Sequence, residues 1–206
     1  MAYTTINKPT EHFNGTAYTG NGTAGRDITL ATFQPDFTWI KSRSDTDNHR
    51  LVDAVRGATK HLESDGNGAE QTSSNVTAFT SDGVTLSSNG AVNANSETYM
   101  SWNWKANGAG SANTDGTITS TVSASTTSGF SIVKYTGNGS AGATIGHGLG
   151  SAPSTIFVKK ISDVGDWTSY HSVLGNTGYM RLNNTNAFAT ASTYWNNTSP
   201  TSSVFT

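Results

Sequence analysis

Short apolar runs separated by polar, glycine-containing turns follow one another along the chain. The runs at 130–135 (Phe-Ser-Ile-Val-Lys-Tyr) and 156–161 (Ile-Phe-Val-Lys-Lys-Ile) have the length of strands. Asn-Gly and Asp-Gly pairs punctuate such runs and suit the positive φ angles of tight turns. Short strands with regular turn signals favour a β-sandwich or barrel. One segment, 49–56 (His-Arg-Leu-Val-Asp-Ala-Val-Arg), is a candidate for a short helix or turn ending at Gly57.

The chain contains an internal duplication. Residues 18–25 (Tyr-Thr-Gly-Asn-Gly-Thr-Ala-Gly) recur at 135–142 with one Thr-to-Ser change, at an offset of 117 positions. The match continues more loosely: Gly57 then falls opposite Gly175. Self-similarity over such a run indicates two copies of one structural unit.

The duplication sets the expected boundaries: an N-terminal arm at 1–12, a first β-sandwich at 13–105, a linker and strand at 106–129, and a second β-sandwich at 130–206. The predicted fold class is all-β, with two tandem β-sandwich modules of jelly-roll or lectin-like type. At most one short helix is expected in each module.

The second unit has no counterpart of residues 86–105. That stretch of the first unit carries Tyr-Met-Ser-Trp-Asn-Trp at 99–104, which has the character of a core-facing strand. We therefore expect the second unit to be incomplete at its C-terminal end. Either the chain is a fragment of a longer protein, which we favour, or another segment supplies the missing strand.

Composition supports a strand-rich scaffold and argues against some partners. Charged residues make up 13% of the chain, about half the usual share of about 25%. Net charge is −2, and the Lys and Arg residues are scattered singly, so we expect no nucleic-acid partner. No apolar run is long enough to span a bilayer as a helix, so we expect no membrane insertion. The chain has no Cys, which removes disulfides and Cys-based metal sites.

The polar residues contain no recognisable catalytic constellation. Asp45 and Asp47 lie in a loop-like stretch without the further oxygen ligands that a calcium loop needs. None of the five His residues has the spacing of a metal-ligand pair. The 20–25 run fits Gly-x-Gly-x-x-Gly, but no helical pattern follows it, so we interpret it as a structural turn used twice. We therefore predict no catalytic residue, no metal site and no cofactor.

Aromatic side chains among amides and hydroxyls are the best candidates for binding. Such a mixture suits a sugar, because flat rings pack on its apolar faces and amides bond its hydroxyls. Core packing is the alternative interpretation for each ring, and it is favoured for Trp39. We predict glycan or partner contacts at Trp167, Tyr170, His171 and Trp195. Tyr194 and Trp195 lie in a looser segment and are candidates for exposure.

The duplicated motif resembles a repeat in structural proteins of tailed bacteriophages. Residues 135–150 (Tyr-Thr-Gly-Asn-Gly-Ser-Ala-Gly-Ala-Thr-Ile-Gly-His-Gly-Leu-Gly) and the later Tyr-His-Ser-Val-Leu-Gly at 170–175 are similar to a repeat found in tail-fibre or adhesin-like virion proteins of marine phages, cyanophages included. Residues 1–13 resemble the N-terminus of such proteins. The family carries no catalytic motif that could be transferred to this sequence.

The resemblance implies a non-enzymatic virion component located in the tail or its fibres. It implies a homo-oligomer, with a trimer expected, whose N-terminal arm at 1–12 contacts other virion proteins. Its β-modules are expected to attach to the host surface, with a glycan as the candidate receptor. One alternative is a decoration or head-fibre protein on the capsid surface, without receptor binding. A more remote alternative is a polysaccharide depolymerase, which would need a pair of carboxylates that the duplication does not repeat.

Overall fold

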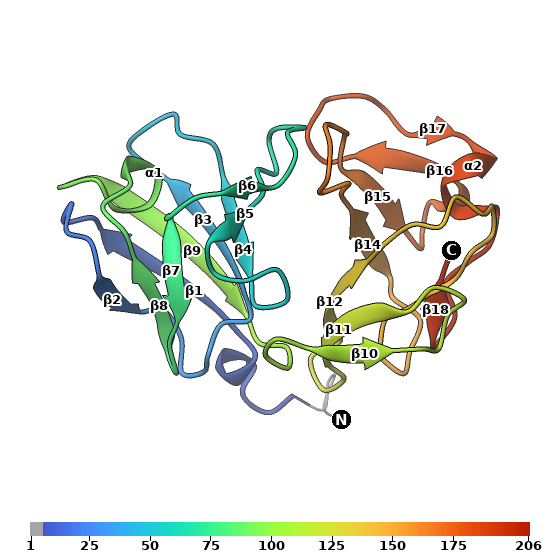
Figure 1. Ribbon diagram of the computed structural model, residues 1–206, viewed down its shortest axis with the longest axis horizontal. Helices are drawn as coiled ribbons and strands as arrows, with labels where there is room; N and C mark the ends of the chain where they lie inside the picture. Colours follow the sequence, from blue (N-terminus) through green and yellow to red (C-terminus); the bar gives the residue numbers. More distant parts are fainter. Residues whose placement is uncertain (1–5) are drawn as a thin grey trace.

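The computed structural model describes residues 6–206 and confirms the predicted fold class: two tandem β-sandwich modules lie side by side (Figure 1). A single 3-10 turn, Pro9–Glu11, precedes the first module. The first module consists of β1 (Phe13–Thr19), β2 (Arg26–Thr29), β3 (Phe37–Ser42), β4 (Arg50–Asp53), β5 (Lys60–His61), β6 (Gln71–Thr72), β7 (Val76–Phe79), β8 (Gly83–Leu86), α1 (Gly90–Asn93) and β9 (Thr98–Trp104). The second consists of β10 (Ser111–Asn113), β11 (Ser120–Ser125), β12 (Phe130–Tyr135), β13 (Ile145–Gly146), β14 (Thr155–Val158), β15 (Thr168–His171), β16 (Gly175–Arg181), β17 (Ala189–Thr190), α2 (Ser192–Trp195) and β18 (Val204–Phe205).

Two antiparallel sheets enclose the core of the first module. One has the strand order β1-β9-β3-β4 and the other β2-β8-β7. Side chains alternate between buried and partly exposed along β3 and β9, as expected for strands with one face on a core. Burying one such Val or Leu contributes about 1.5–3 kcal/mol. Both sheets supply the core, which comprises Ile28, Leu30, Ile40, Val52, Val76, Val84, Leu86, Val92 and Tyr99.

The second module repeats much of this plan with a smaller core. Its strands form the orders β10-β11-β12 and β14-β15-β16-β17, with β13 paired to β18. The β13–β18 pair places Ile145 opposite Phe205, as β2–β8 places Ile28 opposite Val84. Ile145 and Phe205 form a buried cluster with Ile118. The position of each strand along the repeat identifies its counterpart. In this way β12 corresponds to β1, β13 to β2, β14 to β3, β15 to β4 and β18 to β8.

A positive φ angle confirms the alignment of the two repeats at one further point. Gly57 and Gly175, which the sequence places opposite each other, have φ angles of 102° and 78°. Only glycine adopts such angles without steric strain. A positive φ is therefore shared by the two positions, one after β4 and one at the start of β16.

Of the short helix or turn predicted at 49–56, the helix is wrong and a turn is present only at the end of the segment. Residues 50–53 form β4, and 54–56 form a turn. Leu51 lies opposite Trp39 of β3 on one side and forms an isolated bridge to Leu62 on the other. Pairing on both edges decides the conformation, because the local sequence fits either element.

The segment predicted as a linker and strand, 106–129, contains the expected strand as β11, which pairs with β12 along its whole length. The part expected to be a linker is more ordered than predicted, because it forms β10. Part of the predicted arm, residues 1–5, lies outside the described residues. The remainder is tied to the first module, because Lys105 N donates to His12 O at 2.9 Å. None of the helices formed by residues 6–206 is long and apolar enough to cross a bilayer.

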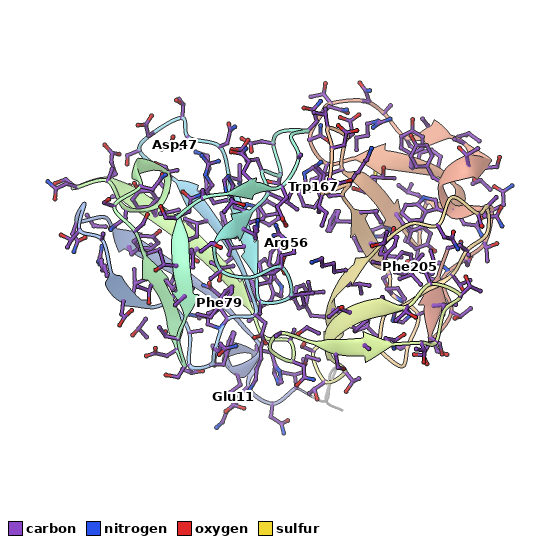
Figure 2. All side chains as sticks on the ribbon, viewed as in Figure 1. Glu11, Asp47, Arg56, Phe79, Trp167 and Phe205 are labelled. Atoms are coloured by element: carbon purple, nitrogen blue, oxygen red, sulfur yellow. The ribbon has the colours of Figure 1, made fainter. Side chains whose placement is uncertain are left out.

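The two modules contact each other directly. Trp167 of the second module lies at the junction (Figure 2) and donates from its indole N–H to Glu63 O of the first at 2.8 Å. It packs with Leu51 and Leu62 in one cluster. At a second contact, Phe130 stacks on Trp104 with 5.8 Å between ring centroids. A single contact would allow one module to rotate about it. Because two separate contacts join the modules, rotation of one module against the other is restricted.

Candidate functional site

A loop of glycine and asparagine follows the first strand of each repeat. It spans 20–25 in the first module and 137–142 in the second. In each loop the Asn side chain, Asn21 or Asn138, accepts a hydrogen bond from the backbone N–H two residues further on, at 3.0 Å and 2.9 Å. The next glycine has a positive φ, 69° in the first loop and 74° in the second. These shared local bonds agree with the interpretation of a structural turn used twice.

In the first module the loop is covered by α1 and by the residues that lead into β9. Gly22 N donates to Asn93 O at 2.7 Å. The hydroxyl of Tyr18, at the end of β1, donates to Val92 O at 2.8 Å. The cover lies so close that a Cβ at Gly20 would be 2.0 Å from the carbonyl oxygen of the residue after α1. Gly20 is therefore required by a close backbone approach.

In the second module the start of the same loop has no such cover, whereas its end approaches the residue after α2: a Cβ at Gly142 would lie 3.1 Å from Asn196 Nδ2. A Cβ built at Gly137, the counterpart of Gly20, would meet no atom within 4 Å, and the same holds at Gly139. Instead the loop borders a cavity of about 490 Å³. The lining also includes Tyr135, the counterpart of Tyr18, and Thr206. Sequence analysis did not predict a site here, although the missing counterpart of residues 86–105 was the signal that could have found it.

Three of the four predicted contact residues are buried. Trp167, Tyr170 and Trp195 are 7%, 4% and 3% exposed. Trp167 packs at the junction between modules, and Tyr170 meets Trp195 edge to face with 5.6 Å between centroids. The indole N–H of Trp195 donates to Gly178 O at 3.0 Å. The expectation that Trp195 is exposed is therefore wrong, because a distant strand covers it.

The fourth residue, His171, is half-buried at the end of β15, and its Nδ1 accepts from Val173 N at 3.2 Å. The structure brings Tyr170 and Trp195 together but does not gather all four predicted residues around one hollow. Glycan or partner contact by the four stays a prediction, and for the three buried rings the structure provides a packing role.

A nearby aromatic cluster contains Tyr194, whose expected exposure is confirmed, although the sequence did not indicate its neighbours in the cluster. The rings of Tyr179 and Tyr194 lie 3.8 Å apart between centroids, and Tyr194 is 36% exposed. The guanidinium of Arg181 lies 5.1 Å from the centre of the Tyr179 ring and forms an ion pair with Asp166. Aromatic rings in close contact beside a charged donor can bind planar or glycan-like surfaces. The sequence does not indicate that these residues are neighbours, because it is the packing of α2 against β16 that brings them together.

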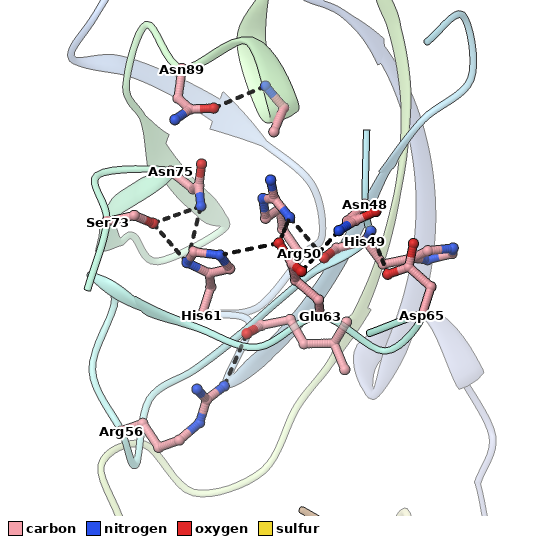
Figure 3. Close-up of polar contacts among 12 residues, drawn as sticks. Asn48, His49, Arg50, Arg56, His61, Glu63, Asp65, Ser73, Asn75 and Asn89 are labelled. Carbon is pink, nitrogen blue, oxygen red and sulfur yellow. Dashed lines mark hydrogen bonds and ion pairs between the residues drawn. The ribbon is translucent and has the colours of Figure 1, made fainter. Parts of the chain in front are cut away.

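The first module contains a buried polar network around His61 (Figure 3). His61 Nδ1 lies 2.7 Å from Ser73 Oγ and 3.2 Å from Asn75 Nδ2. Because the Asn75 amide nitrogen can only donate, Nδ1 is the accepting nitrogen of the ring. On the other side, His61 Nε2 is 3.8 Å from Glu63 Oε1, and Glu63 also contacts Arg50.

Burial, and then the positive charge of Arg50, lower the pKa of His61 to about 4. A ring with this pKa is a weak base at neutral pH, so the Ser73–His61–Glu63 series is poorly suited to activating the Ser73 hydroxyl. The network has a structural role: His61 of β5 connects this strand to Glu63 on one side and to Ser73 and Asn75 on the other. No cluster of three or more potential metal ligands occurs within residues 6–206.

The low pKa of His61 predicts a pH dependence of stability. The ordinary value is 6.5, so the unfolded chain binds a proton that the folded chain does not accept until about pH 4. The stabilisation is fully present above 6.5 and is lost as pH falls toward 4. We expect His61→Gln to lose less stability than the wild type between about pH 7.5 and about pH 5. Urea unfolding at both pH values measures this, and equal losses in the two proteins would contradict it.

The fold and loops define the class of this molecule: an all-β protein made of two related sandwich modules that pack directly on each other. Over residues 8–206 the sequence matches a family described as a domain of unknown function, DUF7483. The chain belongs to that family. No curated protein and no solved structure matches it.

Proposed function

We propose that the chain is a non-enzymatic structural protein of a bacteriophage virion, in a tail fibre or tail-attached adhesin that presents β-modules to the host surface. The observation that carries the proposal is the tandem use of one sandwich, with Trp167 and Phe130 joining the copies. A fibre needs modules that extend its reach without independent rotation, and direct packing restricts rotation. The resemblance of residues 135–150 to repeats of phage fibres supports the same role.

Exposed groups on the second module support a role in attachment. Tyr194 and Arg181 lie beside each other, with Arg181 Nη2 donating to the Tyr194 hydroxyl at 3.2 Å. Rings and guanidinium groups of this kind are common at recognition surfaces. We include a host glycan as the proposed partner of this surface and a trimer as the proposed assembly, following the family resemblance.

Immunogold electron microscopy tests the location, using an antibody raised against this chain on the virion that contains it. Gold on the tail or its fibres is the expected result. Gold spread over the head would replace the proposal with capsid decoration, and the absence of gold from particles, with the antigen detected only in lysate, would refute a virion role. A matched antibody against an unrelated lysate protein is the control.

A further inference from the structure

In the first module β9 joins the two halves of the main sheet. It lies between β1 and β3 and runs antiparallel to both, so that Trp104 faces Phe13 on one side and Phe37 on the other. The backbone groups on the inner edges of β1 and β3 are therefore satisfied by one central strand. Tyr99 of that strand is fully buried in the module core.

The second module has the two flanking strands but no central strand. β12 and β14 correspond to β1 and β3, yet they belong to separate sheets within residues 6–206. β12 pairs with β11 alone, and β14 pairs with β15 alone. Ile118, just before β11, bridges Ile145 of β13, while β18 pairs with β13 on its other side. β11 lies between β10 and β12, so β12 and β14 are each edge strands of their sheets, and within residues 6–206 one edge of each has no partner strand.

Side chains next to this position are less buried than their counterparts. Thr38 and Ile40 of β3 are fully buried. Their counterparts on β14, Ile156 and Val158, are only half-buried, and the intervening Phe157 is 52% exposed. An unpaired strand edge with apolar neighbours is a template for a further strand.

The glycine loop gives an independent indication of what is missing. Gly20 leaves room for the backbone that connects α1 to β9, and Gly137 preserves the same residue type although nothing lies within 4 Å of it. Tyr18 donates its hydroxyl hydrogen to α1, whereas its counterpart Tyr135 lines the cavity and its hydroxyl forms no hydrogen bond within residues 6–206. The cavity is also lined by α2 and by Asn196 and Asn197 after it, so the open space lies between α2 and the glycine loop. Glycine loop, tyrosine and cavity together outline the place of a second helical turn, like α1, beside α2.

We infer that the second module binds a further polypeptide segment from outside residues 1–206, with the chemistry of residues 87–105. Its helical turn fills the cavity beside Gly137, and its alternating strand runs antiparallel between β12 and β14. Addition of a strand supplies main-chain hydrogen bonds on both edges, and alternate side chains cover the apolar positions. A second copy of this chain is a poor source, because its own β9 is already held between β1 and β3 with Tyr99 and Asn103 fully buried.

The inference is tested with the full chain and a synthetic peptide of residues 87–105, labelled for fluorescence anisotropy. We expect saturable binding, and hydrogen exchange should show new protection of backbone amides in 130–135 and 155–158. A peptide with proline in place of Ser101 is the matched control and should not bind, because proline cannot donate to the ladder. Absence of saturable binding, or equal binding of the proline peptide, would overturn the inference.

The Gly137→Ala variant tests the position of the peptide. A Cβ there meets nothing in the free protein but would collide with the peptide carbonyl that corresponds to Ala94 O. We expect unchanged thermal stability and at least tenfold weaker peptide binding. Gly68→Ala, at another open glycine, should bind like the wild type.

Unchanged peptide affinity in Gly137→Ala would contradict the inference. The same conclusion would follow if the free chain formed dimers that protect 130–135 and 155–158 and exclude the peptide, because the occupant would then be a second copy. Neither result depends on where the protein lies in a virion, so this test and the immunogold test can fail separately.

Discussion

Replacing Gly20 with alanine is expected to lower the free energy of unfolding of the first module by about 3 kcal/mol. The added Cβ would lie 2.0 Å from Ala94 O and 2.9 Å from the carbonyl carbon of Asn93. Both atoms are backbone and cannot turn aside as a flexible side chain would. Relief therefore requires the segment between α1 and β9 to move, which weakens the bond from Gly22 N to Asn93 O. Urea unfolding followed by tryptophan fluorescence measures the loss.

Gly137→Ala is the matched control for this prediction, because it occupies the same position in the second repeat with no atom within 4 Å. We expect a change of less than about 0.5 kcal/mol. Equal effects of the two substitutions would show that the close backbone approach does not determine the requirement for glycine at position 20.

Replacing Arg56 with methionine is expected to destabilise the first module by about 3–5 kcal/mol. The guanidinium of Arg56 (Figure 3) lies in the turn after β4, and its side chain is 7% exposed. Its Nε donates to Asp53 Oδ2 at 2.5 Å, and its Nη2 donates to Leu51 O at 2.9 Å. Methionine keeps the apolar length of the side chain but leaves the Asp53 carboxylate, itself 5% exposed, without its countercharge. Thermal and urea unfolding measure the effect.

Lys160→Met provides the comparison for a solvated ion pair. Lys160 and Asp163 are 58% and 64% exposed, so loss of their pair should leave the free energy of unfolding nearly unchanged. The double variant Arg56→Met with Asp53→Asn should recover part of the loss, because it removes the uncompensated charge. If Arg56→Met cost no more than Lys160→Met, burial of the Arg56 pair would not contribute as we infer.

The duplication and the all-β class could be predicted from sequence because local chemistry determines them. A turn that needs a positive φ requires glycine at one position, so the repeat of Gly57 at Gly175 is visible without any knowledge of tertiary contacts. The absence of a counterpart of 86–105 from the second unit could be predicted in the same way. In the structure, β12 and β14 each have an unpaired edge within residues 6–206.

The errors arose where distant partners decide the outcome. Residues 49–56 have an apolar pattern that fits a helix or a strand, and pairing with β3 decides in favour of β4. Residues 106–116 have no apolar period, yet backbone hydrogen bonding to β11 requires none, so a strand forms there. Trp195 lies in a polar segment, and its burial depends on contact with Gly178 and Tyr170. Local composition contains no information about such contacts.

The position of β1 and β9 in the first module also determines how tension along the chain would act on it. The chain enters β1 at Phe13 and leaves β9 at Trp104, and these residues lie opposite each other in adjacent antiparallel strands. A pull on the two flanking segments would therefore load one end of the strand pair. Bonds between such strands are perpendicular to them, so they would break one after another, as in unzipping, instead of resisting together in shear. Under tension, the pair of β1 and β9 would therefore begin to separate at Phe13 and Trp104.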